Sequence, residues 1–71
     1  MLIGDRIREL RLARNWSQEK LAIESGISYG TVRMIESSRT PSPGIQTLVA
    51  IARALEVNLL DIIEGAEDGP Q

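Results

Sequence analysis

Two short helical patterns separated by one glycine, SQEKLAIESGISYGTVRMIE, constrain the fold of this chain more than any other feature. Each pattern begins with a serine N-cap, Ser17 or Ser28, that follows an apolar residue. An apolar residue in that place packs on the fourth residue of the helix and fixes how the chain enters it. Gly26 adopts the left-handed conformation of a sharp helix exit without a Cβ penalty. The segment therefore predicts helices over 18–25 and about 29–37, joined by a tight turn.

Apolar residues at helical spacing predict a further helix on each side of this pair. The first covers about residues 3–14. The segment SSRTPSPG follows the pair. We expect it to be a loop, because its two prolines remove amide donors and restrict the residues before them. The next helix covers about residues 44–55, and its N-cap is either Ser42, with a proline at the first helical position, or Gly44.

A fifth helix is predicted by the capping signal around Asn58, whose capping-box partner is Asp61. The sequence has no strand-like alternation and no internal repeat beyond the repeated caps. We therefore expect an all-α fold, a compact five-helix bundle. The domain is expected to span residues 1–64, with residues 65–71 as a flexible acidic tail or the start of a linker.

The small size of the chain limits how it is stabilised. A domain of 71 residues buries only about 60% of the surface that its unfolded chain exposes. The sequence contains no cysteine and no histidine, so neither disulfides nor the usual zinc sites are available and helix packing must provide the stability. We expect a cytoplasmic protein, because no secretion signal and no apolar run of about 20 residues is present.

Catalysis is not expected. The serines have no histidine partner, and the carboxylates are scattered at helix starts and in the tail. We therefore expect no enzyme activity, no cofactor, no metal and no small-molecule ligand.

The charge is uneven along the chain, although the total is −2. Seven basic and five acidic groups lie in residues 1–40, whereas residues 41–71 carry one basic and five acidic groups. This difference is compatible with two ordinary solvated surfaces, or with a DNA-facing half and a half that faces away from DNA. We expect most of the arginines of the first helix to be solvated, with Arg14 nearest to a DNA backbone contact.

The helix after Ser28 has two different sides on a helical wheel. Val32 and Ile35 share one side with the cap, while Gly30, Arg33 and Met34 lie opposite. No pair of titratable groups converges on the outer side, which argues against an active site. An arginine there can bind O6 and N7 of guanine, and a methionine can contact a thymine methyl group. This side is therefore a candidate surface for the major groove.

Several blocks in order, IGDRIRELR, WSQEKLA, GIS, TVRMIE, TLVAIARAL and VNLLDII, resemble the lambda-repressor-like (Cro/C1, XRE) helix-turn-helix family of DNA-binding regulators. The resemblance covers most of residues 3–63. It implies a five-helix bundle whose third helix enters the major groove, while the start of the second helix lies against the DNA backbone. The chain departs from the family at Ser38 and Glu56, where glycines are common, and in a loop about one residue longer.

The resemblance also implies roles for individual residues. Arg11 and Glu36 are expected to form a structural ion pair between the first and third helices. The expected base contacts are Ser28, Tyr29, Gly30, Arg33 and Met34. The expected contacts to the DNA backbone are Gln18, Thr31, Arg39 and Thr40.

The resulting expectation is a bacterial or phage transcriptional regulator, more specifically a repressor that occupies a palindromic operator in double-stranded DNA. Members of such folds read their sites as symmetric dimers. The surplus of apolar positions in VNLLDII predicts a homodimer through Leu59, Leu60 and Ile63. An alternative is a protein-interaction module of the same fold, such as an antitoxin-type or coactivator-type subunit.

Overall fold

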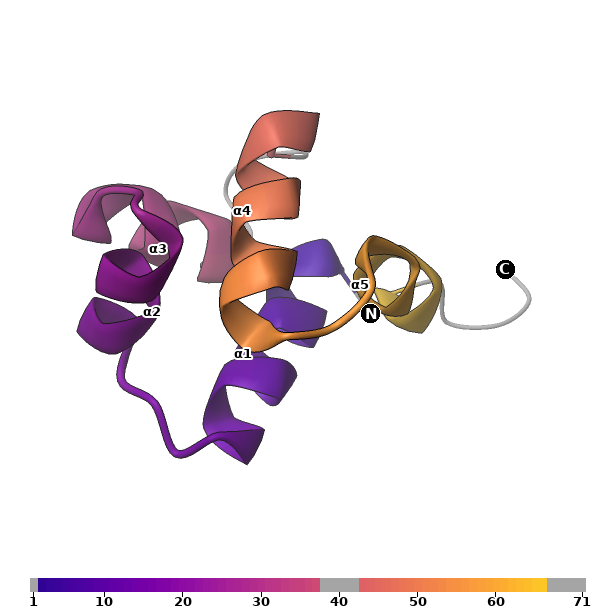
Figure 1. Cartoon of the computed structure of the whole chain (residues 1–71), viewed down its shortest axis with the longest axis horizontal. Helices are drawn as coiled ribbons and strands as arrows, with labels where there is room; N and C mark the ends of the chain where they lie inside the picture. Colours follow the sequence, from indigo (N-terminus) through magenta and orange to yellow (C-terminus); the bar gives the residue numbers. More distant parts are fainter. Residues whose placement is uncertain (1, 38–42, 67–71) are drawn as a thin grey trace.

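The described part of the chain, residues 2–37 and 43–66 of a computed structural model, forms five α-helices and contains no strand (Figure 1). This arrangement confirms the predicted all-α class. None of the described helices has the length and apolar character that a membrane span requires. The helices are α1 (Ile3–Ala13), α2 (Gln18–Ser25), α3 (Tyr29–Glu36), α4 (Ile45–Leu55) and α5 (Leu59–Ala66).

The ends of α2 and α3 follow the predicted capping pattern. The Oγ atom of Ser17 accepts a hydrogen bond from the backbone N–H of Lys20 at 3.0 Å. Ser28 does the same for the N–H of Thr31, also at 3.0 Å. Gly26 has a φ of 73°, in the left-handed region. The turn between the two helices is thus determined by residues within the turn itself.

The start of α4 settles which residue is its N-cap, and the start of α5 follows the predicted capping signal. Gly44 is the N-cap of α4, in place of Ser42, which lies outside the described residues. Glu56 ends α4 with a φ of 59°, a left-handed conformation that costs a non-glycine residue about 1 kcal/mol. Asn58 donates its N–H to the carboxylate of Asp61 at 3.2 Å. The fifth helix continues to Ala66, two residues beyond the expected end of the domain.

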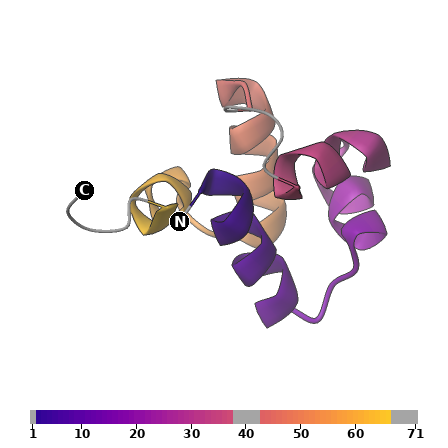
Figure 2. The same cartoon turned by 180° about the vertical axis from the view of Figure 1, so that it is seen from behind.

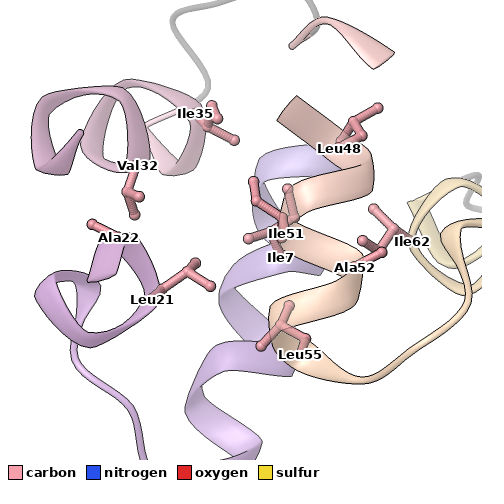
Figure 3. Packing of buried hydrophobic residues seen from close by; sticks show 10 residues of the cluster. All are labelled: Ile7, Leu21, Ala22, Val32, Ile35, Leu48, Ile51, Ala52, Leu55 and Ile62. Carbon is pink, nitrogen blue, oxygen red and sulfur yellow. The ribbon is translucent and has the colours of Figure 1, made fainter. Parts of the chain in front are cut away.

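The helices are arranged around a central pair. In both views α1 and α4 lie between the α2–α3 pair on one side and α5 on the other (Figures 1 and 2). Figure 3 shows how the apolar side chains meet, with Val32 of α3 pointing toward Ala22 of α2. Every helix contributes to this cluster, whose fully buried members are Ile7, Leu21, Val32, Ile51, Leu55 and Ile62.

Gly4 allows α1 to approach α3 very closely. A Cβ atom at this position would collide with the backbone carbonyl oxygen of Ile35, which a change of side-chain rotamer cannot relieve. Because Gly4 lies against the last turn of α3, it helps to fix the position of that turn relative to α1.

We predict that Gly4→Ala lowers the free energy of unfolding by about 1 to 3 kcal/mol, because the backbones of α1 and α3 must separate. Urea denaturation measures this effect. Gly30→Ala is the matched control, since a Cβ atom there meets nothing within 4 Å and alanine favours a helix by up to about 1 kcal/mol. Equal effects of the two substitutions would contradict the close contact.

Candidate nucleic-acid interface

A buried ion pair joins α1 to the end of α3. Arg11 Nε lies 2.7 Å from Glu36 Oε2, and Arg11 Nη2 donates to Glu36 Oε1 at 2.9 Å. Both side chains are largely buried, with exposed fractions of 10% and 1%. Two parallel bonds of this kind are the strongest arrangement between an arginine and a carboxylate. The structure thus places Arg11 and Glu36 together in the structural role expected from the sequence.

Further contacts extend the pair toward α2. Arg11 Nη1 donates to the carbonyl oxygen of Trp16 at 2.7 Å, and Gln18 Nε2 donates to Glu36 Oε1 at 3.1 Å. Within the described residues, no buried side-chain nitrogen or oxygen lacks a hydrogen-bond partner. The start of α2 is therefore held against the end of α3 by the same carboxylate. These bonds use only one N–H of the Gln18 side-chain amide. Its second N–H and its oxygen can therefore bind a ligand.

The outer side of α3 is exposed as the helical wheel predicts. Val32 and Ile35 are buried, whereas Gly30 is exposed and Met34 is 56% exposed. Arg33 is exposed too, and its guanidinium carbon lies 5.7 Å from the centre of the Tyr29 ring. This cation–π contact holds the Arg33 side chain along the helix without burying it.

The expected contact residues at the start of α3 are partly engaged in the helix cap. Ser28 and Thr31 share a hydrogen bond between their hydroxyl groups at 2.7 Å. Both hydroxyls lie at the helix start, where unpaired N–H groups and the helix dipole attract anions. Arg39 and Thr40, the other two expected backbone contacts, lie outside the described residues.

An open hollow of about 610 Å³ lies beside α3. It brings Gln18, an expected backbone contact, to the same surface as Gly30, Arg33 and Met34, three expected base contacts. We call it the α1–α3 concavity. Its lining residues are Arg8, Gln18, Gly30, Arg33, Met34, Glu36 and Ser37.

Two arginines expected to be solvated also bind distant backbone carbonyl groups. Arg14 Nη1 donates to the carbonyl oxygen of Leu55 at 2.9 Å, and its guanidinium lies 4.9 Å from the Trp16 ring centre. Arg6 Nε donates to the carbonyl oxygen of Asp61 at 3.1 Å. These partners are 41 and 55 residues away in sequence, so no local pattern indicated them. Arg14 is exposed and Arg6 is half-buried, so both side chains keep access to solvent, and the DNA contact of Arg14 stays a prediction.

Gly65 leaves the space through which Arg6 reaches α5. A Cβ atom on Gly65 would overlap the Arg6 guanidinium. Gly65 thus accommodates the Arg6 side chain where it crosses from α1 to α5, while the buried Ile62 packs α5 on the core.

The apolar residues expected at a dimer interface differ in exposure. Leu60 is 60% exposed on α5, while Leu59 and Ile63 are half-buried and Leu59 packs on the core. Ile23 on α2 is 75% exposed. Leu60 thus exposes apolar surface on α5, the helix for which the sequence predicts a dimer contact. Ile23 exposes apolar surface on α2.

Comparisons with known proteins agree with this geometry. A family model described as Helix-turn-helix matches residues 7–62. The crystal structure of the restriction-modification controller protein C.AhdI from Aeromonas hydrophila superposes with a TM-score of 0.80 at 32% identity, covering 84% of this chain and 89% of that one.

Two curated relatives come from Bacillus subtilis (strain 168). The uncharacterised HTH-type transcriptional regulator RghRB is 35% identical over 63 residues, which are 89% of this chain and 45% of that protein. The HTH-type transcriptional regulator SlrR is 33% identical over 63 residues, 89% of this chain and 41% of that protein. This chain therefore spans less than half the length of these relatives.

We predict that Glu36→Gln lowers the free energy of unfolding by about 3 to 5 kcal/mol, because it leaves the charge of Arg11 buried without a counter-ion. Urea denaturation followed by circular dichroism measures the loss. Glu24→Gln is the control, since Glu24 pairs with Lys20 at 3.0 Å on the surface and its removal is expected to cost about 0.5 kcal/mol or less. Similar losses in the two variants would contradict a buried, structural pair.

Proposed function

Because the chain belongs to the lambda-repressor-like (Cro/C1, XRE) helix-turn-helix family, we propose that it is a sequence-specific DNA-binding transcriptional regulator. The relatives named as transcriptional regulators, and the controller protein with the same fold, support this proposal. The observation that carries it is the outer side of α3. Gly30, Arg33 and Met34 lie there together on one open surface.

The proposed binding mode places α3 in the major groove. The exposed Arg33 then reaches O6 and N7 of a guanine, and its contact with Tyr29 reduces the conformational freedom that it loses on binding. The missing side chain of Gly30 allows the DNA to approach the helix backbone, and Met34 contacts a thymine methyl group. Gln18 and the capped starts of α2 and α3 bind phosphates and fix the orientation of the protein.

The regulatory proposal is repression in the cytoplasm by occupation of a palindromic operator. A protein on an operator needs only to exclude the transcription machinery, so no cofactor and no catalytic step enter the proposal.

A protein-interaction module, of an antitoxin or coactivator type, is the second candidate. The observation that favours it is a hollow on the α2–α3 pair whose apolar lining includes Ile23, which is 75% exposed, together with Ile27 and Tyr29. Such a module would bind another protein, and it would show no sequence-selective DNA affinity with the steep salt dependence that phosphate contacts produce.

Selection from a pool of random DNA duplexes at about 0.1 M salt tests the proposed function, because phosphate contacts still contribute to affinity under that condition. We expect wild-type protein to enrich an inverted repeat with half-sites about 10 base pairs apart, centre to centre. The same selection with Arg33→Ala is expected to retain the repeat but to relax one base position, with a loss of about 1 to 3 kcal/mol at the wild-type site.

Each result has a separate meaning. Flat enrichment by wild-type protein would contradict sequence-specific binding and favour the interaction module. A wild-type motif that Arg33→Ala leaves unchanged at every position would show that Arg33 reads no base.

We further propose that the operator-bound form is a homodimer that meets through α5, with Leu60 at its centre and Leu59 and Ile63 beside it. We predict that Leu60→Lys shifts sedimentation at high micromolar concentration from dimer to monomer, because a charge would then be buried at the interface. Ile23→Lys is the control, because Ile23 is an apolar residue on another helix and is more exposed than Leu60, at 75% against 60%. Wild-type protein that sediments only as a monomer would contradict the dimer.

A further inference from the structure

Arg8 is distinguished among the basic residues of α1 by the weakness of its protein contacts. Arg6, Arg11 and Arg14 each donate to a protein oxygen at 3.1 Å or less. Arg8 Nη2, in contrast, lies 3.5 Å from the carbonyl oxygen of Glu36. Its Nε atom lies 3.7 Å from Glu36 Oε1. Contacts of this length are at the limit of hydrogen bonding, and the side chain is 50% exposed.

The charge of Arg8 is also not needed to neutralise Glu36. That carboxylate already has two bonds from Arg11 and one from Gln18, and it is 1% exposed. Arg8 therefore adds a positive charge to the α1–α3 concavity, which Arg33 also lines. Two arginines, Arg8 and Arg33, line this surface. Among the described lining residues, the one carboxylate, Glu36, is neutralised by the buried Arg11. The remaining positive charge favours an anion there.

The position of Arg8 indicates which anion. The guanidinium group has the planar fork that matches phosphate oxygens. Arg8 lines the same concavity as Gly30, Arg33 and Met34, which we place against base edges. Gln18, which we place against a phosphate, lines it as well. A sugar-phosphate strand borders the major groove on each side, so a DNA that receives α3 must bring phosphates close to the rim of this concavity.

From these observations we infer that Arg8 binds a backbone phosphate of the DNA whose major groove receives α3. This inference rests on the proposed function and adds α1 to the elements that contact DNA. A phosphate contact carries no sequence information, so Arg8 fixes the position of the protein on DNA and contributes to affinity for every duplex.

Fluorescence anisotropy with the full chain tests the inference on two duplexes of equal length, the selected operator and a scrambled sequence, over a series of salt concentrations. Arg8→Ala is expected to weaken binding to both duplexes by the same factor, about three- to tenfold for each bound subunit. The slope of log affinity against log salt should become shallower by about 0.9 for each lost phosphate contact, and therefore by about 1.8 for the proposed dimer, which loses one contact in each subunit. The thermal midpoint should stay close to wild type, because Arg8 has only long contacts in the protein.

Arg53→Ala is the matched control, because it removes the same charge from an exposed position on α4, beside a different hollow lined by Glu24 and Glu56. It is expected to leave affinity and salt slope close to wild type, because Arg53 does not line the α1–α3 concavity. Operators with a single neutral methylphosphonate then locate the contact. One such replacement should weaken wild-type binding but not add to the loss in Arg8→Ala.

The outcomes separate this inference from the proposed function. If wild-type protein prefers the operator while Arg8→Ala behaves like Arg53→Ala, the phosphate contact is wrong and the proposed function stands. A changed base preference in Arg8→Ala would also overturn it, because Arg8 would then read sequence. Wild-type protein that does not discriminate between the duplexes would overturn the proposed function, and the inference with it.

Discussion

The buried ion pair between Arg11 and Glu36 is the interaction on which the arrangement of the other parts depends. Removing two charges from water costs several kcal/mol per ion, and good geometry with further hydrogen bonds must compensate for this cost. Here the bonds come from three segments, because Arg11 also binds the Trp16 carbonyl and Gln18 also binds Glu36. A shift of α3 against α1 would leave a buried charge without its partner, and a shift of α3 against α2 would break the hydrogen bond from Gln18 to Glu36. The pair and its hydrogen bonds therefore restrict the relative positions of these three helices in addition to the apolar contacts of the core.

This restriction explains how an eight-residue helix can hold its exposed side in a fixed position. A helix as short as α3 is not stable alone, so its order comes from its packing. Val32, Ile35 and Glu36 are buried, and Gly4 lets α1 close against its last turn. The inner side holds the helix in place and the outer side does not contribute to the core. Outer residues can therefore change between proteins of this fold without loss of the bundle.

The helices were predictable because their signals are local. Serine caps, Gly26 and the apolar spacing lie within the segments that they organise, and the observed ends fall within about two residues of those predicted. The outer side of α3 follows from the same helical period. The contacts of Arg6 and Arg14 with backbone carbonyl groups, and the fit of Gly4 against Ile35, were not predictable. They depend on how distant helices approach one another, and a single arginine or glycine in a helical pattern does not indicate its distant partner.

The contact of Arg6 with α5 has a consequence for the geometry of an assembled protein. Arg6 passes over Gly65 and binds the carbonyl oxygen of Asp61, so α5 is fastened to α1, and α1 is in turn fastened to α3 through Glu36. In a dimer formed through α5, this rigid path through each subunit sets the distance and the angle between the two copies of α3. Under the proposed dimeric binding mode, the spacing of the two half-sites then depends on contacts inside each protomer. On that proposal, a longer or shorter site would require a change in how α5 packs on α1, while the residues proposed to contact bases could stay the same.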